Sequence, residues 1–143
     1  MHRKVQCWIF SRDTSGNELC LLLKTNVLRG QFWQPVTGSV EDNEGYFEAA
    51  CRETFEETKF RFSAPPVDTG FEFGFRSRLG AARERVFALF VDEMPTPTLD
   101  PREHDEYQWI SPVLASKLLR YPSNHDGLVQ SYKRIFGKEL KNE

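Results

Sequence analysis

Three closely spaced glutamates are the first candidates for chemistry in this sequence. Glu53, Glu56 and Glu57 lie in the segment 46–60, whose composition predicts a helix. At about 100° per residue, Glu56 and Glu57 fall within about 60° of Glu53 on either side, so the three carboxylates share one helix face. Carboxylates so close together repel one another, and a bound cation removes that repulsion. Because Mg²⁺ prefers oxygen ligands and is usually held by one or two carboxylates plus substrate phosphate, the cluster predicts a site for Mg²⁺, or for Mn²⁺ in its place.

The same acids would also suit a solvated helix face. In that interpretation Glu48 and Arg52 form an ion pair four residues apart, and the other acids only add solubility. The opposite helix face should pack on the rest of the protein, which leaves the acids pointing outwards. That apolar face consists of Phe47, Ala50, Cys51, Thr54 and Thr58.

Short strands are expected before and after this helix in the sequence, and two further helices near the C-terminal end. Two apolar strands, 5–11 and 19–23, should be joined by a turn in the sequence DTSGN. The segment FWQPVTG should be a short or edge strand, because Pro35 cannot donate a backbone hydrogen bond. Strands at 71–78 and 84–93 should form a hairpin around a loop at 79–82, and a strand at 107–110 should precede helices at 113–119 and 127–136. This order predicts an α+β fold with a mixed β-sheet and helical layers.

Length and composition limit the class of protein. With 143 residues, 39% of them apolar and 28% charged, the chain should form a single domain over residues 1–143. The net charge of −2 argues against a nucleic-acid partner. Three cysteines without metal-ligand spacing indicate reduced thiols, and the sequence contains no long apolar segment that would span a membrane. We therefore expect a cytoplasmic protein that does not bind membranes.

The residues around the glutamates resemble a known motif. The stretch GSVEDNEGYFEAACRETFEETKF is similar to the Nudix box, with Gly38, Glu44, Arg52 and all three helix glutamates in register. Two positions depart from the motif: Thr54 replaces an aliphatic residue, and Lys59 stands where glycine would end the helix. A lysine in a left-handed helix cap costs about 1 kcal/mol, but neither change affects an acid. The resemblance implies a Nudix-type α/β/α sandwich, as found in MutT-like hydrolases.

A weaker resemblance extends over most of the chain. FWQPVTGSVE, REHDEYQWI and YPSN look similar to the bacterial dihydroneopterin triphosphate and dATP pyrophosphatase branch of the Nudix family. The branch implies metal ligands at Glu53, Glu57 and Glu103, with Glu56 as a further candidate. Glu103 lies in a long acidic loop, 94–106, where it could also be a solvated acid, with His104, Asp105 or Glu106 in its place.

The resemblance also suggests supporting and substrate-binding residues. It implies that Arg52 orients the helix glutamates through a salt bridge and that Glu44 supports the same network. For substrate it points to Lys4, Lys24 and Thr37, beside Gly38. A surface lysine and an ordinary strand threonine are equally good interpretations of Lys24 and Thr37.

The predicted hairpin carries four arginines: Arg76, Arg78, Arg83 and Arg85. Arg76 and Arg78 are candidates for binding triphosphate oxygens, beside aromatic residues that could stack a purine or pterin ring. The alternative is a core face made by Phe71, Phe73 and Phe75 with the arginines in solvent. Trp33 and Trp109 are expected in the core or in the wall of the site.

These expectations define a reaction. The resemblance implies a Mg²⁺-dependent pyrophosphohydrolase that cleaves a (d)NTP or dihydroneopterin triphosphate to the monophosphate and pyrophosphate, with Glu56 or Glu57 as general base. A second interpretation is hydrolysis of dinucleoside polyphosphates, oxidised nucleotides or RNA 5′ triphosphate ends. A third is a non-catalytic nucleotide sensor, which would not need a complete set of glutamates. The expected ligand is a small nucleoside or pterin triphosphate, and the protein is either a monomer or a homodimer.

Overall fold

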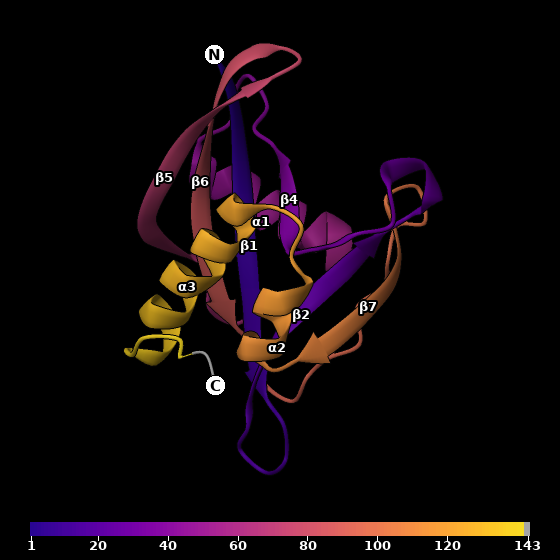
Figure 1. The fold of residues 1–143 in the computed structure, drawn as a ribbon, viewed down its shortest axis with the longest axis vertical. Helices are drawn as coiled ribbons and strands as arrows, with labels where there is room; N and C mark the ends of the chain where they lie inside the picture. Colours follow the sequence, from indigo (N-terminus) through magenta and orange to yellow (C-terminus); the bar gives the residue numbers. More distant parts are fainter. Residues whose placement is uncertain (142–143) are drawn as a thin grey trace.

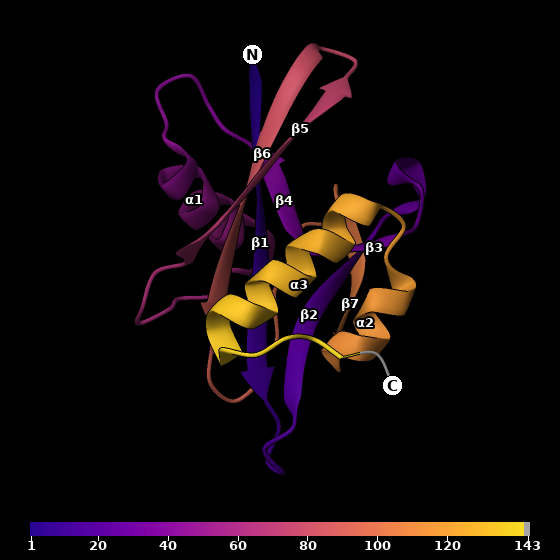
Figure 2. The ribbon, with the colours of Figure 1, turned by 60° about the vertical axis from the view of Figure 1, so that its left-hand side comes forward.

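A computed structural model describes residues 1–141 as a sheet between helices. The strands are β1 (His2–Arg12), β2 (Glu18–Thr25), β3 (Trp33–Gln34), β4 (Val36–Ser39), β5 (Val67–Ser77), β6 (Gly80–Phe90) and β7 (His104–Ile110). The helices are α1 (Tyr46–Thr58), α2 (Pro112–Leu118) and α3 (Pro122–Phe136), with a 3-10 turn η1 (Val27–Arg29). Figures 1 and 2 show α1 on one side of β1, and α2 and α3 on the other.

The sheet is mixed, as the sequence predicts. Its strand order is β3-β2-β1-β6-β5, with β4 paired to β1 and β7 paired to β2. β1 runs parallel to β6 and antiparallel to β2 and β4. β5 and β6 form the expected hairpin, although β6 already begins at Gly80, inside the segment that was expected to be a loop.

The two first strands separate towards the N-terminal end of β1. They pair only over Phe10–Arg12 and Glu18–Cys20. Beyond this point β4 pairs with β1, while β3 and β7 pair with β2. Pro35 lies between β3 and β4, so the expected strand FWQPVTG is divided into two short pieces, because proline cannot donate a ladder hydrogen bond.

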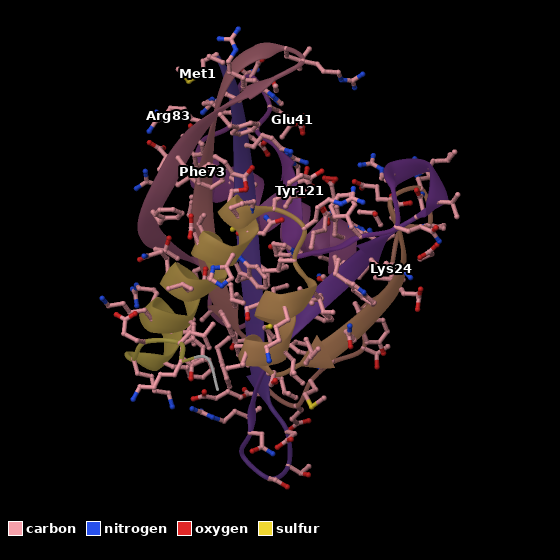
Figure 3. All side chains as sticks on the ribbon, viewed as in Figure 1. Met1, Lys24, Glu41, Phe73, Arg83 and Tyr121 are labelled. Atoms are coloured by element: carbon pink, nitrogen blue, oxygen red, sulfur yellow. The ribbon has the colours of Figure 1, made fainter. Side chains whose placement is uncertain are left out.

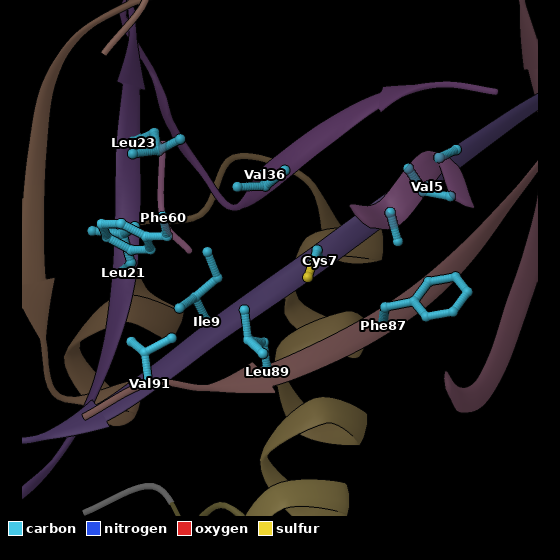
Figure 4. Close-up of a cluster of buried hydrophobic side chains, with 12 residues drawn as sticks. Val5, Cys7, Ile9, Leu21, Leu23, Val36, Phe60, Phe87, Leu89 and Val91 are labelled. Atoms are coloured by element: carbon cyan, nitrogen blue, oxygen red, sulfur yellow. The ribbon is translucent and has the colours of Figure 1, made fainter. Parts of the chain in front are cut away.

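Alternating side chains on β1 build a core on each face of the sheet. Val5, Cys7 and Ile9 face α1, where they pack with Ala49, Ala50 and residues of the neighbouring strands (Figure 4). Trp8 and Phe10 face the other way and pack with Leu128 and Tyr132 of α3. Burial of each large apolar side chain contributes about 1.5–3 kcal/mol, so both helical layers are held firmly against the sheet.

Several element boundaries differ from those predicted. β7 begins at His104 rather than at 107, because the end of the acidic segment pairs with Lys24 and Thr25 of β2. α3 begins at Pro122 rather than at 127, since proline fits the first turn of a helix, where no N–H donor is needed. Within residues 1–141, no helix has the length and apolar character that crossing a membrane requires.

The prediction of which face of α1 packs on the sheet was partly wrong. Ala50, Thr54 and Thr58 are buried as expected, but Phe47 is 46% exposed. Glu57, expected to point outwards, is only 1% exposed. The helix is therefore turned so that Glu53 lies over Gly38 of β4 and Glu57 faces His104 of β7, while Glu56 stays exposed.

Candidate active site

The ends of α1 are fixed by local contacts. The Glu48 carboxylate accepts a hydrogen bond from the Gly45 N–H at 3.1 Å, which satisfies one of the unpaired donors at the helix start. At the other end Lys59 adopts the left-handed conformation, with φ of 62°, and donates its N–H to the Phe55 carbonyl at 2.7 Å. The Lys59 ammonium lies 5.2 Å from the centre of the Phe55 ring. Lysine thus takes the place of the motif glycine and keeps the cap.

Arg52 is the centre of an ion-pair network. Its guanidinium donates to Glu44 at 2.7 and 2.9 Å, and to Glu53 and Glu56 at 2.7 Å each. It also donates to the Ser39 carbonyl of β4 at 2.8 Å. These hydrogen bonds lower the pKa of Glu44 to about 2, so Glu44 stays ionised and holds the arginine in place. The geometry corresponds to the orienting role expected for Arg52 and Glu44.

The position of Gly38 shows why the motif requires glycine there. The Glu53 carboxylate lies directly over it, and a Cβ on residue 38 would stand 2.1 Å from the Glu53 Cδ atom. Any side chain at this position would therefore push Glu53 out of its place beside the sheet. The glycine provides room for a carboxylate rather than an unusual backbone angle.

Glu57 is a buried carboxylate without a hydrogen-bond donor. Neither of its oxygens has a donor within hydrogen-bond geometry among the described residues, although the Thr37 backbone N–H is near enough to lower its pKa in part. Burial raises the pKa of Glu57 well above its ordinary value, and the neighbouring Glu53 and Glu103 charges raise it further. An uncompensated buried acid is costly, so such groups usually have a functional explanation.

His104 faces the Glu57 carboxylate. Its Nδ1 lies 3.8 Å from Glu57 Oε1, and its Nε2 lies 2.9 Å from the amide nitrogen of Gln34. Because an amide nitrogen only donates, Nε2 must accept and the proton must be on Nδ1, facing Glu57. Burial lowers the pKa of His104 to about 4, so the ring is neutral at pH 7. His104 therefore presents a neutral N–H to Glu57.

The residues around Glu57 fit a divalent cation. Glu53 lies beside it, and Glu103, on the adjacent loop, is close enough to act on its pKa. The Glu103 carboxylate is 3.7 Å from Arg29, and its carbonyl accepts from the Asn26 N–H. Within residues 1–141 no three potential ligands are already assembled into a complete cage. The unpaired Glu57 carboxylate, beside a Glu53 carboxylate whose Oε1 accepts from Arg52, suits Mg²⁺, which keeps several water ligands and also uses substrate oxygens.

A pocket of about 640 Å³ opens on the α3 side of the sheet. Two predicted substrate residues, Lys4 and Thr37, line it. The glutamates themselves do not line it; the link to them is Gln34, which lines the pocket and contacts His104, the residue that faces Glu57. The remaining lining residues are Thr25, Arg29, Phe32, Phe73, Gly74, Phe75, Glu84, Tyr121, Ser123 and Asn124.

Other predicted substrate residues lie outside this lining. Lys24 pairs with Glu106 at 3.2 Å and lies over the Trp33 ring. Arg76 and Arg78 are at the tip of the β5–β6 hairpin, away from the pocket residues. The structure therefore does not bring these three cations together with Lys4 and Thr37.

The other two hairpin arginines are neutralised by acids of β5. Arg83 pairs with Glu72 at 2.9 Å, and Arg85 pairs with Asp68 at 2.7 Å. Figure 3 shows Arg83 at the outer side of the hairpin. Phe73 and Phe75 line the pocket, and Phe73 also packs against the core on the α3 side. Phe73 and Phe75 thus fit the interpretation as a binding surface, and Phe71 and Phe73 fit the interpretation as core.

Sequence reasoning missed the residues that complete the pocket from distant segments. Arg29 comes from η1, Glu84 from β6, and Tyr121 and Asn124 from the start of α3. The YPSN resemblance pointed to Tyr121 and Asn124, but Glu84 lies between Arg83 and Arg85 in the sequence, and nothing local distinguishes it from a solvated acid although it is 6% exposed.

Comparison with known proteins identifies the fold. A family model described as NUDIX domain matches residues 1–132. The chain resembles a C. elegans Ap4A hydrolase with a TM-score of 0.80 and 18% identity, covering 96% of this chain and 100% of that one. It resembles the E. coli dihydroneopterin triphosphate pyrophosphohydrolase with a TM-score of 0.77 and 24% identity, covering 95% and 96%. These similarities confirm the predicted α/β/α sandwich.

Two further proteins show how varied the relatives are. The NUDIX domain of Shewanella oneidensis NrtR, solved with ADP ribose, has a TM-score of 0.74 and 12% identity, covering 93% of this chain and 87% of that one. An octanoyltransferase of Myxococcus xanthus is 35% identical over 123 residues, which are 80% of this chain and 31% of that protein. The chain thus spans about a third of the length of this curated relative.

Proposed function

The chain belongs to the Nudix family, and we propose that it is a hydrolase of phosphorus-containing anhydrides that cleaves a nucleoside or pterin triphosphate to the monophosphate and pyrophosphate. The observation that carries this proposal is Glu57, a buried carboxylate whose oxygens have no donor among the described residues. Such a carboxylate is stabilised either by a proton or by a cation, and substrate phosphate is the usual companion of such a cation.

In the proposed mechanism Glu53 and Glu57 would hold Mg²⁺ or Mn²⁺, with Glu103 as a further ligand. When bound, the cation would lower the pKa of a water molecule and offset charge on the phosphate undergoing in-line attack. The role of Arg52 is to keep Glu53 and Glu56 in fixed positions by donating to both. The Nδ1 of neutral His104 faces Glu57 at 3.8 Å, too far for a hydrogen bond, so it does not neutralise the buried carboxylate.

Glu56 is assigned as the general base. Its side chain is 47% exposed, whereas Glu57 is sealed from solvent. Arg52 contacts Glu56 Oε1, which leaves the other carboxylate oxygen for the proton of the attacking water. The choice between Glu56 and Glu57 thus follows from their different exposure.

The pocket supplies positive charge near the glutamates. Arg29 lines the pocket and lies within 3.7 Å of Glu103, so its guanidinium can offset phosphate charge at the metal end. Thr37 lines the pocket beside Gly38, and its hydroxyl can donate to a phosphate oxygen. We place the triphosphate along these residues and the attached ring in the deeper part of the pocket.

Turnover of a substrate panel tests the proposal. The protein is incubated with Mg²⁺ and the dNTPs, dihydroneopterin triphosphate, a dinucleoside polyphosphate and a 5′-triphosphorylated RNA, and the products are identified by mass. Pyrophosphate with a monophosphate is the expected product pair. The Glu53→Gln and Glu57→Gln variants should lose this activity, whereas Glu139→Gln, which removes a carboxylate paired with Lys133 on α3, should keep it. Full activity of Glu57→Gln, or no hydrolysis of any anhydride, would refute the mechanism.

A further inference from the structure

The deeper part of the pocket contains a carboxylate that the hydrolytic mechanism does not use. Glu84 of β6 lines the pocket although it is only 6% exposed. The pKa of Glu84 is raised overall, because burial outweighs the Gln6 hydrogen bond and the nearby Lys4 charge, which lower it. Within residues 1–141 one hydrogen bond reaches this carboxylate, from the Gln6 amide to Oε2 at 2.7 Å. The other oxygen, Oε1, remains available to a ligand.

A buried chain of hydrogen bonds fixes the orientation of Glu84. The Trp8 indole N–H donates to Gln6 Oε1 at 2.6 Å, so the Gln6 NH₂ must point towards Glu84. Both Gln6 and Trp8 are fully buried. α3 passes so close that a Cβ on Gly127 would stand 1.9 Å from Gln6 Oε1. Gln6 therefore cannot turn away, and Glu84 can only act as an acceptor on its Oε2 side.

Strand register places a cation and an aromatic ring beside this acid. Lys4 is the register partner of Glu84 on β1, and Phe73 is its partner on β5. All three residues line the pocket. This row lies on the β1–β6–β5 side of the pocket, whereas Thr37 and Gln34 come from β4 and β3 on the side of the catalytic glutamates. The row is therefore the end of the pocket that would hold the ring of a substrate.

Aromatic side chains provide the walls for a flat ring. Phe73 and Phe75 contribute from β5, and Phe32 and Tyr121 from the opposite side, where their rings meet edge to face at 5.5 Å. Figure 3 shows Phe73 and Tyr121 near the N-terminal end of α3. Aromatic walls gain stacking energy from any base, so they bind a ring without choosing between rings. Selectivity between different rings must therefore come from the polar groups of the pocket.

We infer that Glu84 and Lys4 select a heterocycle whose edge presents two adjacent N–H donors followed by a carbonyl, the edge shared by guanine and pterin. The carboxylate accepts from the ring N–H and the exocyclic amine, and the lysine donates to the carbonyl oxygen. Adenine and cytosine place a ring nitrogen lone pair where the carboxylate needs a donor. Uracil and thymine place a carbonyl there, so all four would bring an acceptor against an acceptor. This inference rests on the proposed function, because it assigns the substrate class of the same site.

Binding of monophosphates to metal-free protein tests the inference without turnover. Calorimetric titrations in EDTA would compare dGMP, dIMP, dAMP and dCMP, with neopterin as the pterin probe. Because dIMP differs from dGMP only by the exocyclic amine, losing a hydrogen bond to a charged acceptor should weaken its binding about tenfold to hundredfold. The dAMP and dCMP affinities should be lower still. Tight binding of neopterin but not dGMP would identify pterin as the ring, and the reverse would identify guanine.

Variants assign the selectivity to Glu84. Glu84→Gln keeps the shape of the side chain but replaces one acceptor by a donor, so the dGMP to dIMP affinity ratio should fall towards one. Glu72→Gln removes a carboxylate from the same hairpin, one that pairs with Arg83 outside the pocket, and should leave the ratio unchanged. Circular dichroism would establish that both variants are folded. Equal binding of dGMP and dAMP, an unchanged ratio in Glu84→Gln, or no binding of either dGMP or neopterin would overturn the inference.

The two proposals fail in different ways. A protein that binds dGMP or neopterin selectively but hydrolyses no triphosphate would refute the proposed function and leave the selectivity of the pocket standing. A protein that hydrolyses the four dNTPs with equal kcat/KM, and binds their monophosphates equally, would refute the selectivity alone.

Discussion

Removing the charge of Glu57 should make the metal-free protein more stable and inactive at the same time. Its carboxylate is 1% exposed, with no donor to either oxygen among the described residues. Leaving a buried polar group unpaired costs about 1–3 kcal/mol, and more when the group is charged. In Glu57→Gln the amide is neutral and can donate to the adjacent Glu53. We therefore expect the free energy of unfolding to rise by about 1–3 kcal/mol in EDTA, equivalent to an increase in Tm of roughly 2–12 °C.

The size of the stability difference between Glu57→Gln and wild type depends on pH. The folded-state pKa of Glu57 is raised above its ordinary value of 4.5, so the folded state holds a proton that the unfolded state releases. Its contribution to stability is present below pH 4.5 and is lost as the pH rises through the folded-state pKa. The advantage of the glutamine variant should accordingly grow with pH above 4.5.

The assay is urea unfolding of wild type and Glu57→Gln across pH, with EDTA or with Mg²⁺. Mg²⁺ at 100 times its Kd should stabilise the wild type by about 2.7 kcal/mol, and the variant by much less. Glu56→Gln is a matched control on the same helix, because Glu56 is 47% exposed and paired with Arg52, so its loss should not stabilise the protein. If Glu57→Gln is no more stable than wild type in EDTA, and Mg²⁺ stabilises both equally, the reasoning is refuted.

Three other changes give further tests. Gly38→Ala should lower kcat/KM about 100-fold with the fold retained by circular dichroism, because the added methyl group displaces the Glu53 carboxylate. Arg52→Lys should lower both kcat and Tm, since an ammonium cannot reproduce the forked contacts to Glu44 and Glu53, and an unchanged kcat would contradict the orienting role. The pKa of His104 is about 4 in the folded protein and 6.5 ordinarily, so the unfolded state takes up a proton first as the pH falls. In metal-free protein the free energy of unfolding should therefore decrease by up to about 3 kcal/mol between pH 6.5 and pH 4. Urea unfolding of His104→Asn should not show this decrease.

The sequence predicted the fold class where the signals were local. The strands at 5–11 and 19–23, the short strand around Pro35 and the helix from residue 46 follow from the chemistry of neighbouring residues, and the structure contains them. The family motif and the fold are confirmed by the comparisons. The single domain over residues 1–143, the cytoplasmic location and the choice between monomer and homodimer stay predictions.

Properties that depend on distant segments could not be predicted in the same way. A helical wheel shows which residues share a face but not which face meets the sheet, so the burial of Glu57 was missed and Phe47 was wrongly placed in the core. The contact of His104 with Glu57 depends on the pairing of β7 with β2, which alternation alone does not specify. The pocket was missed for the same reason, because its lining comes from segments as far apart as Lys4 and Asn124.

The parallel pairing of β1 with β6 determines when during folding the site can appear. His2 is the register partner of Ala82, and Phe10 is the partner of Phe90. β1 therefore cannot complete its pairing until β6, which is synthesised about 80 residues later, is available. Closing so long a loop is entropically costly, and non-local pairing of this kind slows folding. During synthesis α1 would emerge before β6 can complete the sheet on which it packs. We expect the acid cluster to bind metal only after this late pairing, so that a nascent chain carries the full motif without the activity.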